Sequence, residues 1–118
     1  MAKAQAFAAE FRAANAVGSY AKLMAVPGLD VVHIATPHSE HHAHALLCLR
    51  AGLAVLCEKP FTINAGQTRE LIDVAQAQGT FLMEAFWTRF FRAVAQALEL
   101  ARSGAIGEVK HLAADFGG

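Results

Sequence analysis

The chain is poor in cysteine, in net charge and in long apolar runs. Its two cysteines do not make a disulfide framework, which favours reduced thiols in a cytoplasmic protein. Ten basic residues balance ten acidic ones, so we expect no nucleic acid and no membrane surface as partners. Apolar runs stay below the roughly 18–20 residues of a membrane span, and residues 1–5 lack the apolar core of a secretory signal.

A glycine-rich phosphate loop is also missing. Gly66 and Gly79 stand alone, whereas phosphate binding needs a close backbone approach at the amino end of a helix. The chain has instead an alanine-rich composition with 55% hydrophobic and 17% charged residues, which is typical of a folded globular protein. With 118 residues there is room for one domain at most.

Short apolar runs alternate along the chain with segments of helical spacing. The apolar runs predict strands at 31–35, 53–57 and 80–83. The helical spacing predicts helices at 3–14, 40–51, 65–78 and 91–103, and a short one after Ser19. The expected helix caps are Ser19, Ser39 and Asn64, and the expected helix-ending glycines are Gly52, Gly79 and Gly104. This order indicates an α/β protein with a parallel sheet and right-handed crossovers.

The stretch Cys57–Phe61 puts an acid and an amine directly after an apolar strand. Ligands of open α/β sheets bind at the carboxyl ends of the strands. The stretch therefore marks a candidate site.

Four motifs, taken together, resemble one known family. They are Ile34–Pro37, His41, Glu58–Pro60 and Met83–Phe90, and in this order they are similar to the glucose–fructose oxidoreductase/inositol dehydrogenase (Gfo/Idh/MocA) family. The segments Glu84–Phe91 and Gly104–Val109 most resemble its dihydrodiol dehydrogenase and xylose dehydrogenase branch. The resemblance covers essentially the whole chain.

The resemblance implies a partial Rossmann fold, a doubly wound parallel sheet that lacks its first βαβ unit. Residues 1–104 would be the carboxyl-terminal part of the dinucleotide-binding domain with its connecting helix, and residues 105–118 the start of a carboxyl-terminal α+β domain, with a strand at 108–116. The strand at 31–35 would then be an exposed edge, which favours self-association.

The same resemblance implies hydride transfer between NAD or NADP and a sugar, polyol or diol hydroxyl, in a homo-oligomer. The segment that separates NAD from NADP and the downstream proton-relay groups would lie outside these residues. The chain alone is therefore expected to be inactive.

Residue roles also follow from the resemblance. Lys59 would be the catalytic lysine, because an ammonium at a strand end can hydrogen-bond a substrate oxygen, and burial would lower its pKa toward the working range. Glu58 would meet the cofactor ribose or orient Lys59. His38 stands where many relatives carry Asn. The cofactor-binding residues implied are Thr36, Pro37, His38, His41, Glu58, Lys59, Trp87 and Arg89.

Several alternatives remain beside these roles. Lys59 could be a solvated turn lysine paired with Glu58, and Trp87 and Arg89 could serve packing and surface pairing. Cys57 is expected to be a packed residue and His33 a core or strand-end histidine.

Two functions from other classes are also open. One is a non-catalytic binding module, and the other is a metal-binding protein that uses a histidine cluster. No Cys, Asp or third spaced histidine completes a tetrahedral set, so we expect no metal. The clustered histidines are His38, His41, His42 and His44.

Overall fold

The computed structural model describes residues 1–115. By their contacts, the residues form two compact units, one from Met1 to Ala85 and one from Phe86 onward. The domain boundary predicted between residues 104 and 105 stays a prediction.

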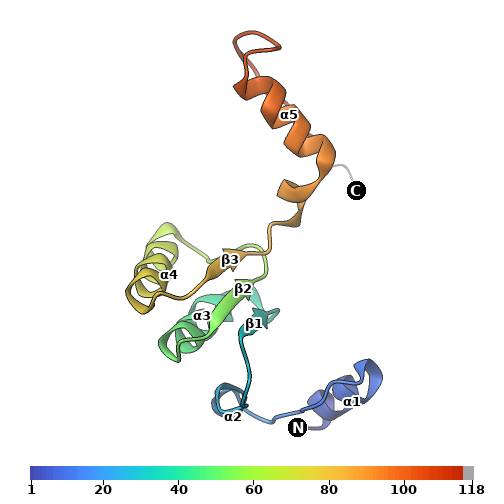
Figure 1. Cartoon of the computed structure of the whole chain (residues 1–118), viewed down its shortest axis with the longest axis vertical. Helices are drawn as coiled ribbons and strands as arrows, with labels where there is room; N and C mark the ends of the chain where they lie inside the picture. Colours follow the sequence, from blue (N-terminus) through green and yellow to red (C-terminus); the bar gives the residue numbers. More distant parts are fainter. Residues whose placement is uncertain (116–118) are drawn as a thin grey trace. The chain divides into compact units, whose positions relative to one another are not determined.

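The first unit is built on a parallel sheet. Its strands are β1 (Val31–Ile34), β2 (Ala54–Cys57) and β3 (Leu82–Glu84), in the spatial order β1-β2-β3 (Figure 1). Short apolar runs form such strands because both faces of a parallel sheet can be covered. The parallel α/β sheet predicted from the sequence is therefore confirmed.

Helices connect the strands. Helix α3 (His41–Arg50) links β1 to β2 and packs against both strands, and α4 (Ala65–Gln78) links β2 to β3 and packs against α3. The helices α1 (Ala2–Phe11) and α2 (Tyr20–Met24) precede the sheet, and a 3-10 turn, η1 (His38–Glu40), leads into α3. Helices α3 and α4 are the crossover connections expected between parallel strands.

A small core lies between the sheet and its helices. Leu49 of α3, Val55 of β2 and Leu71 of α4 are fully buried. Burial of each such side chain contributes about 1.5–3 kcal/mol relative to its exposure. The other buried hydrophobic residues are Val32, Ile34, Ala45, Leu46, Cys48, Cys57 and Ala75.

Local capping decides where two of the helices begin and end. The side chain of Asn64 accepts from the Gln67 N–H at 3.0 Å, and that of Ser19 accepts from the Lys22 N–H at 3.3 Å, as predicted. Gly79 ends α4 with φ of 62°, a left-handed conformation that a glycine adopts without strain. Ser39 does not cap α3: its hydroxyl turns to the Glu40 carboxylate, and η1 takes the place of a capped start.

The second unit contains η2 (Trp87–Phe90), a turn that the sequence did not predict, and α5 (Arg92–Arg102). The predicted strand at 108–116 is wrong over residues 108–115, which carry no strand. A strand needs a neighbour to hydrogen-bond its backbone, and no described strand pairs with this segment. Phe116 lies outside the described residues.

β1 is an edge strand, as the sequence predicted. Among the described residues no strand pairs with its outer side, and Val31 is 51% exposed. None of the helices in residues 1–115 is both long and apolar enough to cross a membrane.

Candidate functional site

The residues that follow the strands lie at one edge of the sheet. Ile34, Cys57 and Glu84 are in register across the three strands, so their carboxyl ends are level. Two backbone hydrogen bonds extend this alignment beyond the strands, from Glu58 N–H to Ile34 O at 2.9 Å and from Ala85 N–H to Cys57 O at 2.7 Å. The strand order and register therefore bring Thr36–Pro37 and Glu58–Pro60 to the same edge, where ligands of open α/β sheets bind.

Lys59 lies at this edge with its side chain exposed. Among residues 1–115, no ion pair joins its ammonium to a carboxylate. The surface pairing with Glu58 that was the alternative for Lys59 is thus not formed, and neither is the expected burial of the amine. Lys59 offers an amine to a ligand without first breaking an ion pair.

Glu58 turns toward β1 instead of toward the lysine ammonium. Its Oε1 lies 3.2 Å from Nε2 of His33, and its Oε2 accepts from the backbone N–H of Lys59 at 3.3 Å. His33 is exposed, with 52% of its side chain accessible, so it is not a core histidine. Its position beside a strand end is the part of the prediction that holds. Glu58 is therefore placed to orient the backbone of Lys59.

Thr36 and His44 form a second polar contact at the edge. Thr36 Oγ1 lies 3.0 Å from Nδ1 of His44, whose Nε2 is 4.0 Å from Glu40 Oε2. The Tyr20 ring packs on His44 with centroids 4.3 Å apart. The sequence did not predict the contact between His44 and Thr36. The signal available for it was that the two residues stand eight positions apart, on either side of a turn and a helix start.

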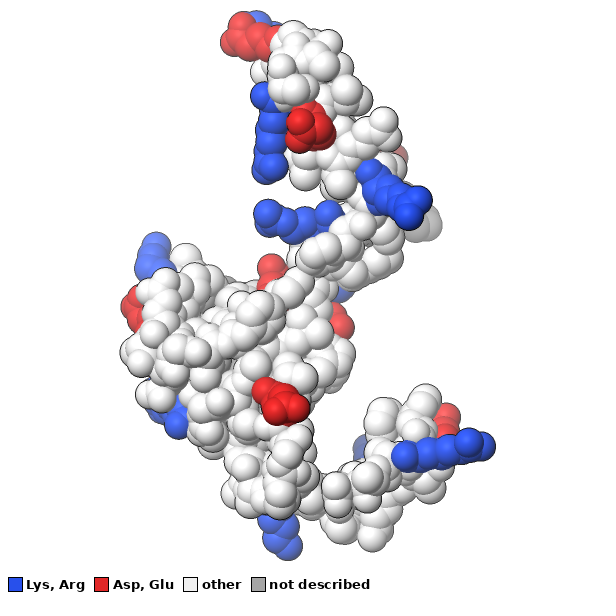
Figure 2. Space-filling model, viewed as in Figure 1, with Lys and Arg blue, Asp and Glu red and all other residues white. Residues whose placement is uncertain are grey.

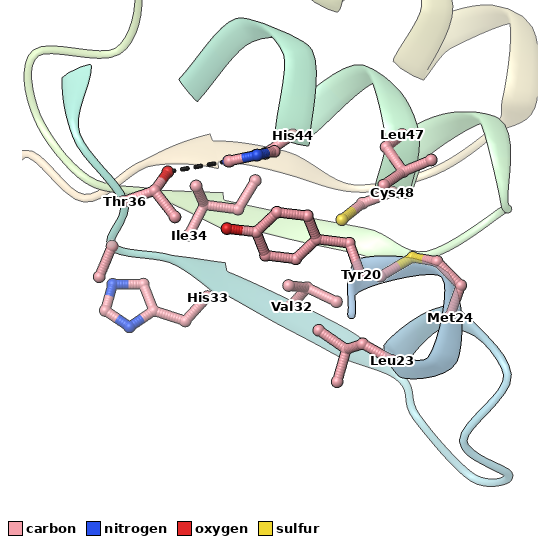
Figure 3. Close-up of a pocket in the computed structure, with 11 residues that line it drawn as sticks. Tyr20, Leu23, Met24, Val32, His33, Ile34, Thr36, His44, Leu47 and Cys48 are labelled. Carbon is pink, nitrogen blue, oxygen red and sulfur yellow. Dashed lines mark hydrogen bonds between the residues drawn. The ribbon is translucent and has the colours of Figure 1, made fainter. Parts of the chain in front are cut away.

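A small apolar pocket lies behind these residues. Tyr20 lies across it, with the Thr36–His44 hydrogen bond at one end and Met24 at the other (Figure 3). Its volume of about 80 Å³ is far below the roughly 300–1,000 Å³ of ligand pockets. A dinucleotide does not fit in it.

His41 is the first residue of α3 and is fully buried. Its Nδ1 lies 2.9 Å from the carbonyl oxygen of Pro60, and its Nε2 lies 2.9 Å from that of Thr36. The ring therefore links the segment after β1 to the segment after β2. Pro37 and His38 are exposed beside it, and the His38 ring meets the His41 ring edge to face at 5.5 Å.

Glu84 completes the edge from β3. Its Oε1 accepts from the backbone N–H of Phe61 at 2.9 Å. Sequence reasoning included Glu84 in a motif but gave it no role. The signal was available, because a carboxylate at the end of a short apolar strand needs a donor nearby.

Cys57 is fully buried directly below this turn. Burial, reinforced by the carboxylates of Glu84 and Glu58, raises the pKa of the Cys57 thiol to about 11. The thiolate is the nucleophile of cysteine chemistry, so this thiol is a packed residue and not a reactive one, as the sequence indicated.

The clustered histidines take separate partners. His42 Nε2 lies 2.9 Å from Glu70 Oε2, while His41 and His44 are held by the contacts above. Within residues 1–115, no group of three His, Cys, Asp or Glu side chains comes together to hold a metal ion.

Trp87 and Arg89 belong to the second unit, in η2. Trp87 is 56% exposed, and its ring meets that of Phe91 edge to face at 4.9 Å. Their contact with a cofactor stays a prediction.

Charge is distributed without a dominant sign. Lys, Arg, Asp and Glu side chains of the first unit are scattered among uncharged residues on the face shown in Figure 2. This agrees with the balance of ten basic and ten acidic residues. Neither sign of charge therefore dominates this face of the first unit.

Comparison with known proteins identifies the family of the chain. Residues 1–86 match the family model of the Gfo/Idh/MocA oxidoreductases, described as an oxidoreductase family with an NAD-binding Rossmann fold. The trans-1,2-dihydrobenzene-1,2-diol dehydrogenase of Mus musculus is 46% identical over 115 residues, which are 98% of this chain and 34% of the relative. The D-xylose 1-dehydrogenase (NADP(+)) of Hypocrea jecorina is 48% identical over 103 residues, covering 87% of this chain and 26% of the relative.

A solved structure shows the same fold. The NAD binding oxidoreductase from Klebsiella pneumoniae superposes with a TM-score of 0.82 at 34% identity, over 91% of this chain and 28% of that protein. The chain thus spans about a quarter to a third of the length of these proteins. The family and the Rossmann fold predicted from the motifs are confirmed. The chain belongs to the Gfo/Idh/MocA oxidoreductase family, and its first unit is part of that family's NAD-binding Rossmann fold.

Proposed function

We propose that the protein to which this chain belongs transfers a hydride between NAD or NADP and a hydroxyl of a sugar, polyol or diol, and that Lys59 is its catalytic residue. The observation that supports this most is the exposed amine of Lys59 at the level carboxyl edge of the sheet, without an ion pair among the described residues. The relatives named for a diol and a sugar supply the substrate class.

The groups at this edge fit a dinucleotide cofactor. They combine a half-buried hydroxyl at Thr36, a carboxylate at Glu58 and the amine of Lys59, which suits hydrogen bonds to ribose hydroxyls and a carboxamide. Pro37, His38 and His41 would complete the cofactor-binding groups of the first unit. Trp87 and Arg89 are also proposed to contact the cofactor. The nicotinamide, when bound, accepts or returns the hydride.

Lys59 manages the proton in this proposal. When the alcohol carbon loses a hydride, its hydroxyl must also lose a proton, and the neutral amine of Lys59 accepts that proton at Nζ. In the reverse direction the ammonium returns the proton to the oxygen. Before transfer, the substrate hydroxyl donates a hydrogen bond to Nζ, which orients the hydroxyl. General acid–base catalysis by such a group typically accelerates a reaction about 10²–10⁴-fold.

Two further properties are proposed for the whole protein. The two cysteines of the chain are free and buried in the structure, which supports a reducing, cytoplasmic location. The unpaired outer side of β1 supports pairing with a further strand of the protein. A homo-oligomer is proposed for the complete enzyme from the family resemblance.

A chimera tests the catalytic proposal. These 118 residues would replace the corresponding segment of the mouse relative, to which they are 46% identical. With NAD⁺ or NADP⁺ and either trans-1,2-dihydrobenzene-1,2-diol or D-xylose, we expect reduction of the nicotinamide. Lys59→Met should lower kcat at least about 100-fold, because the proton acceptor is lost.

Lys22→Met is the matched control, since Lys22 is an exposed lysine on α2 that is not among the proposed site residues. Equal activity of the two variants would reject Lys59 as the catalytic residue. A chimera that binds the nicotinamide cofactor without turnover would favour the non-catalytic binding module instead.

A further inference from the structure

One peptide group beside Lys59 is held at both of its ends. The carbonyl oxygen of Pro60 lies 2.9 Å from Nδ1 of His41, and the N–H of Phe61 donates to Oε1 of Glu84 at 2.9 Å. These two atoms belong to the same Pro60–Phe61 amide. Two side chains from different elements therefore clamp a single peptide plane.

Both clamping residues are anchored in the packed part of the first unit. His41 is the first residue of α3 and is fully buried, and Glu84 is the last residue of β3 and is partly buried. Their backbones are therefore fixed by the helix and by the β2–β3 pairing. Loop side chains would hold the peptide less precisely.

The second nitrogen of His41 extends the clamp to the neighbouring strand. Nε2 lies 2.9 Å from the carbonyl oxygen of Thr36, so the ring joins the segment after β1 to the turn after β2. Carbonyl oxygens only accept, so a ring nitrogen that bonds one of them is the donor. No buried side-chain polar atom is left without a partner among the described residues, so the arrangement is fully satisfied.

The two hydrogen bonds on the amide reinforce each other. Donation from Phe61 N–H to a carboxylate polarises the amide and makes the Pro60 oxygen a stronger acceptor for His41. The amide plane sets the direction in which the chain runs back to Lys59, one residue earlier. A displacement of about 1 Å at a reacting group can cost about 100-fold in rate.

We propose that His41 and Glu84 are positioning residues that hold the Lys59 turn through the two ends of the Pro60–Phe61 peptide. The role in catalysis rests on the proposed function, in which Lys59 is the proton acceptor. The clamp itself is a property of this chain and is measured separately.

Amide hydrogen exchange of Phe61, measured by NMR in the 118-residue chain, tests the clamp. Two substitutions of His41 separate its two contacts. The amide nitrogen of Asn occupies the place of Nδ1, so His41→Asn keeps the donor to Pro60. The amide nitrogen of Gln occupies the place of Nε2, so His41→Gln keeps only the donor to Thr36.

We expect Phe61 to exchange about tenfold faster in His41→Gln than in His41→Asn, because only the first loses the Pro60 contact. A role of His41 in packing alone predicts the opposite order, since Gln fills the buried volume better. The amide chemical shift of Lys59 should move in His41→Gln and stay near its original value in His41→Asn.

Glu84→Gln removes the carboxylate at the other end with little change in shape. It should speed Phe61 exchange about tenfold, because a neutral amide oxygen is a weaker acceptor than a carboxylate. Glu70→Gln is the matched control, since Glu70 binds His42 at the surface and not the turn. Exchange at the core residue Leu49 and a thermal melt show that each variant is folded.

Equal Phe61 exchange in the Asn and Gln variants, or unchanged exchange in Glu84→Gln, overturns the clamp. Should neither His41 variant melt cooperatively, the isosteric Glu84→Gln decides the outcome alone. These results do not depend on turnover, whereas Lys59→Met in the chimera tests the proposed function. The two proposals therefore fail separately.

Discussion

The first unit, here called the sheet unit, and helix α5 both have apolar residues at the spacing of their helices or strands. Only the sheet unit buries these residues. Leu49 in α3 and Val55 in β2 are fully buried, whereas Leu98 and Leu100 in α5 are 42% and 41% exposed. α5 contains no buried residue, although its spacing is that of an amphipathic helix. An apolar pattern therefore specifies an element, and a facing surface decides whether it becomes a core.

Removing a leucine from each region gives the largest expected contrast. Leu49→Ala should lower the free energy of unfolding by about 3 kcal/mol, since it leaves a cavity between α3 and the sheet. Leu98→Ala should cost below about 1 kcal/mol, because its side chain already meets solvent. Urea unfolding of both variants measures the difference. Similar losses for the two would show that α5 is packed in solution as tightly as α3.

Burial in the sheet unit also has a pH signature at Cys57. The pKa of its thiol is raised to about 11 from an ordinary value of 9.0. Between these values the unfolded chain releases the thiol proton and the folded chain keeps it. Stability is therefore lost as the pH rises, by about 2 kcal/mol between pH 9 and pH 11.

The difference between the original chain and Cys57→Ala isolates this contribution from other effects of pH on stability. Urea unfolding at pH 8, 9, 10 and 11 should show a steeper decline for the chain that keeps the thiol. Parallel pH profiles for the two proteins would rule out a proton held by burial at Cys57.

Helix capping gives the smallest of the expected contrasts. α4 begins with Asn64, whose side chain accepts a hydrogen bond from Gln67 N–H, whereas α5 begins at Phe91 without a side-chain cap. Asn64→Ala should destabilise the chain by about 1 kcal/mol, and Asn64→Gly by only a few tenths. Thermal melts compare the two. An equal loss for both variants would assign the effect to the backbone and not to the side-chain hydrogen bond.

Much of the first unit could be predicted from the sequence. The apolar runs near β1 and β2, the Asn64 cap and the left-handed Gly79 depend on residues close together in the chain. The expected third strand began two residues early, at 80 instead of 82, because pairing with β2 and not propensity sets its start. The expected strand at 108–116 is absent over 108–115, where no described neighbour hydrogen-bonds it.

The candidate site shows the same division. The sequence determined that an acid, an amine and a proline follow β2, and that hydroxyl and histidine groups follow β1, because those residues are adjacent to apolar runs. It also identified the family from the order of these motifs. Only the tertiary structure decided that Glu58 turns to His33, and that His41 and Glu84 hold one peptide of the Lys59 turn. These contacts join residues 19 to 25 positions apart, and strand order, register and burial bring them together.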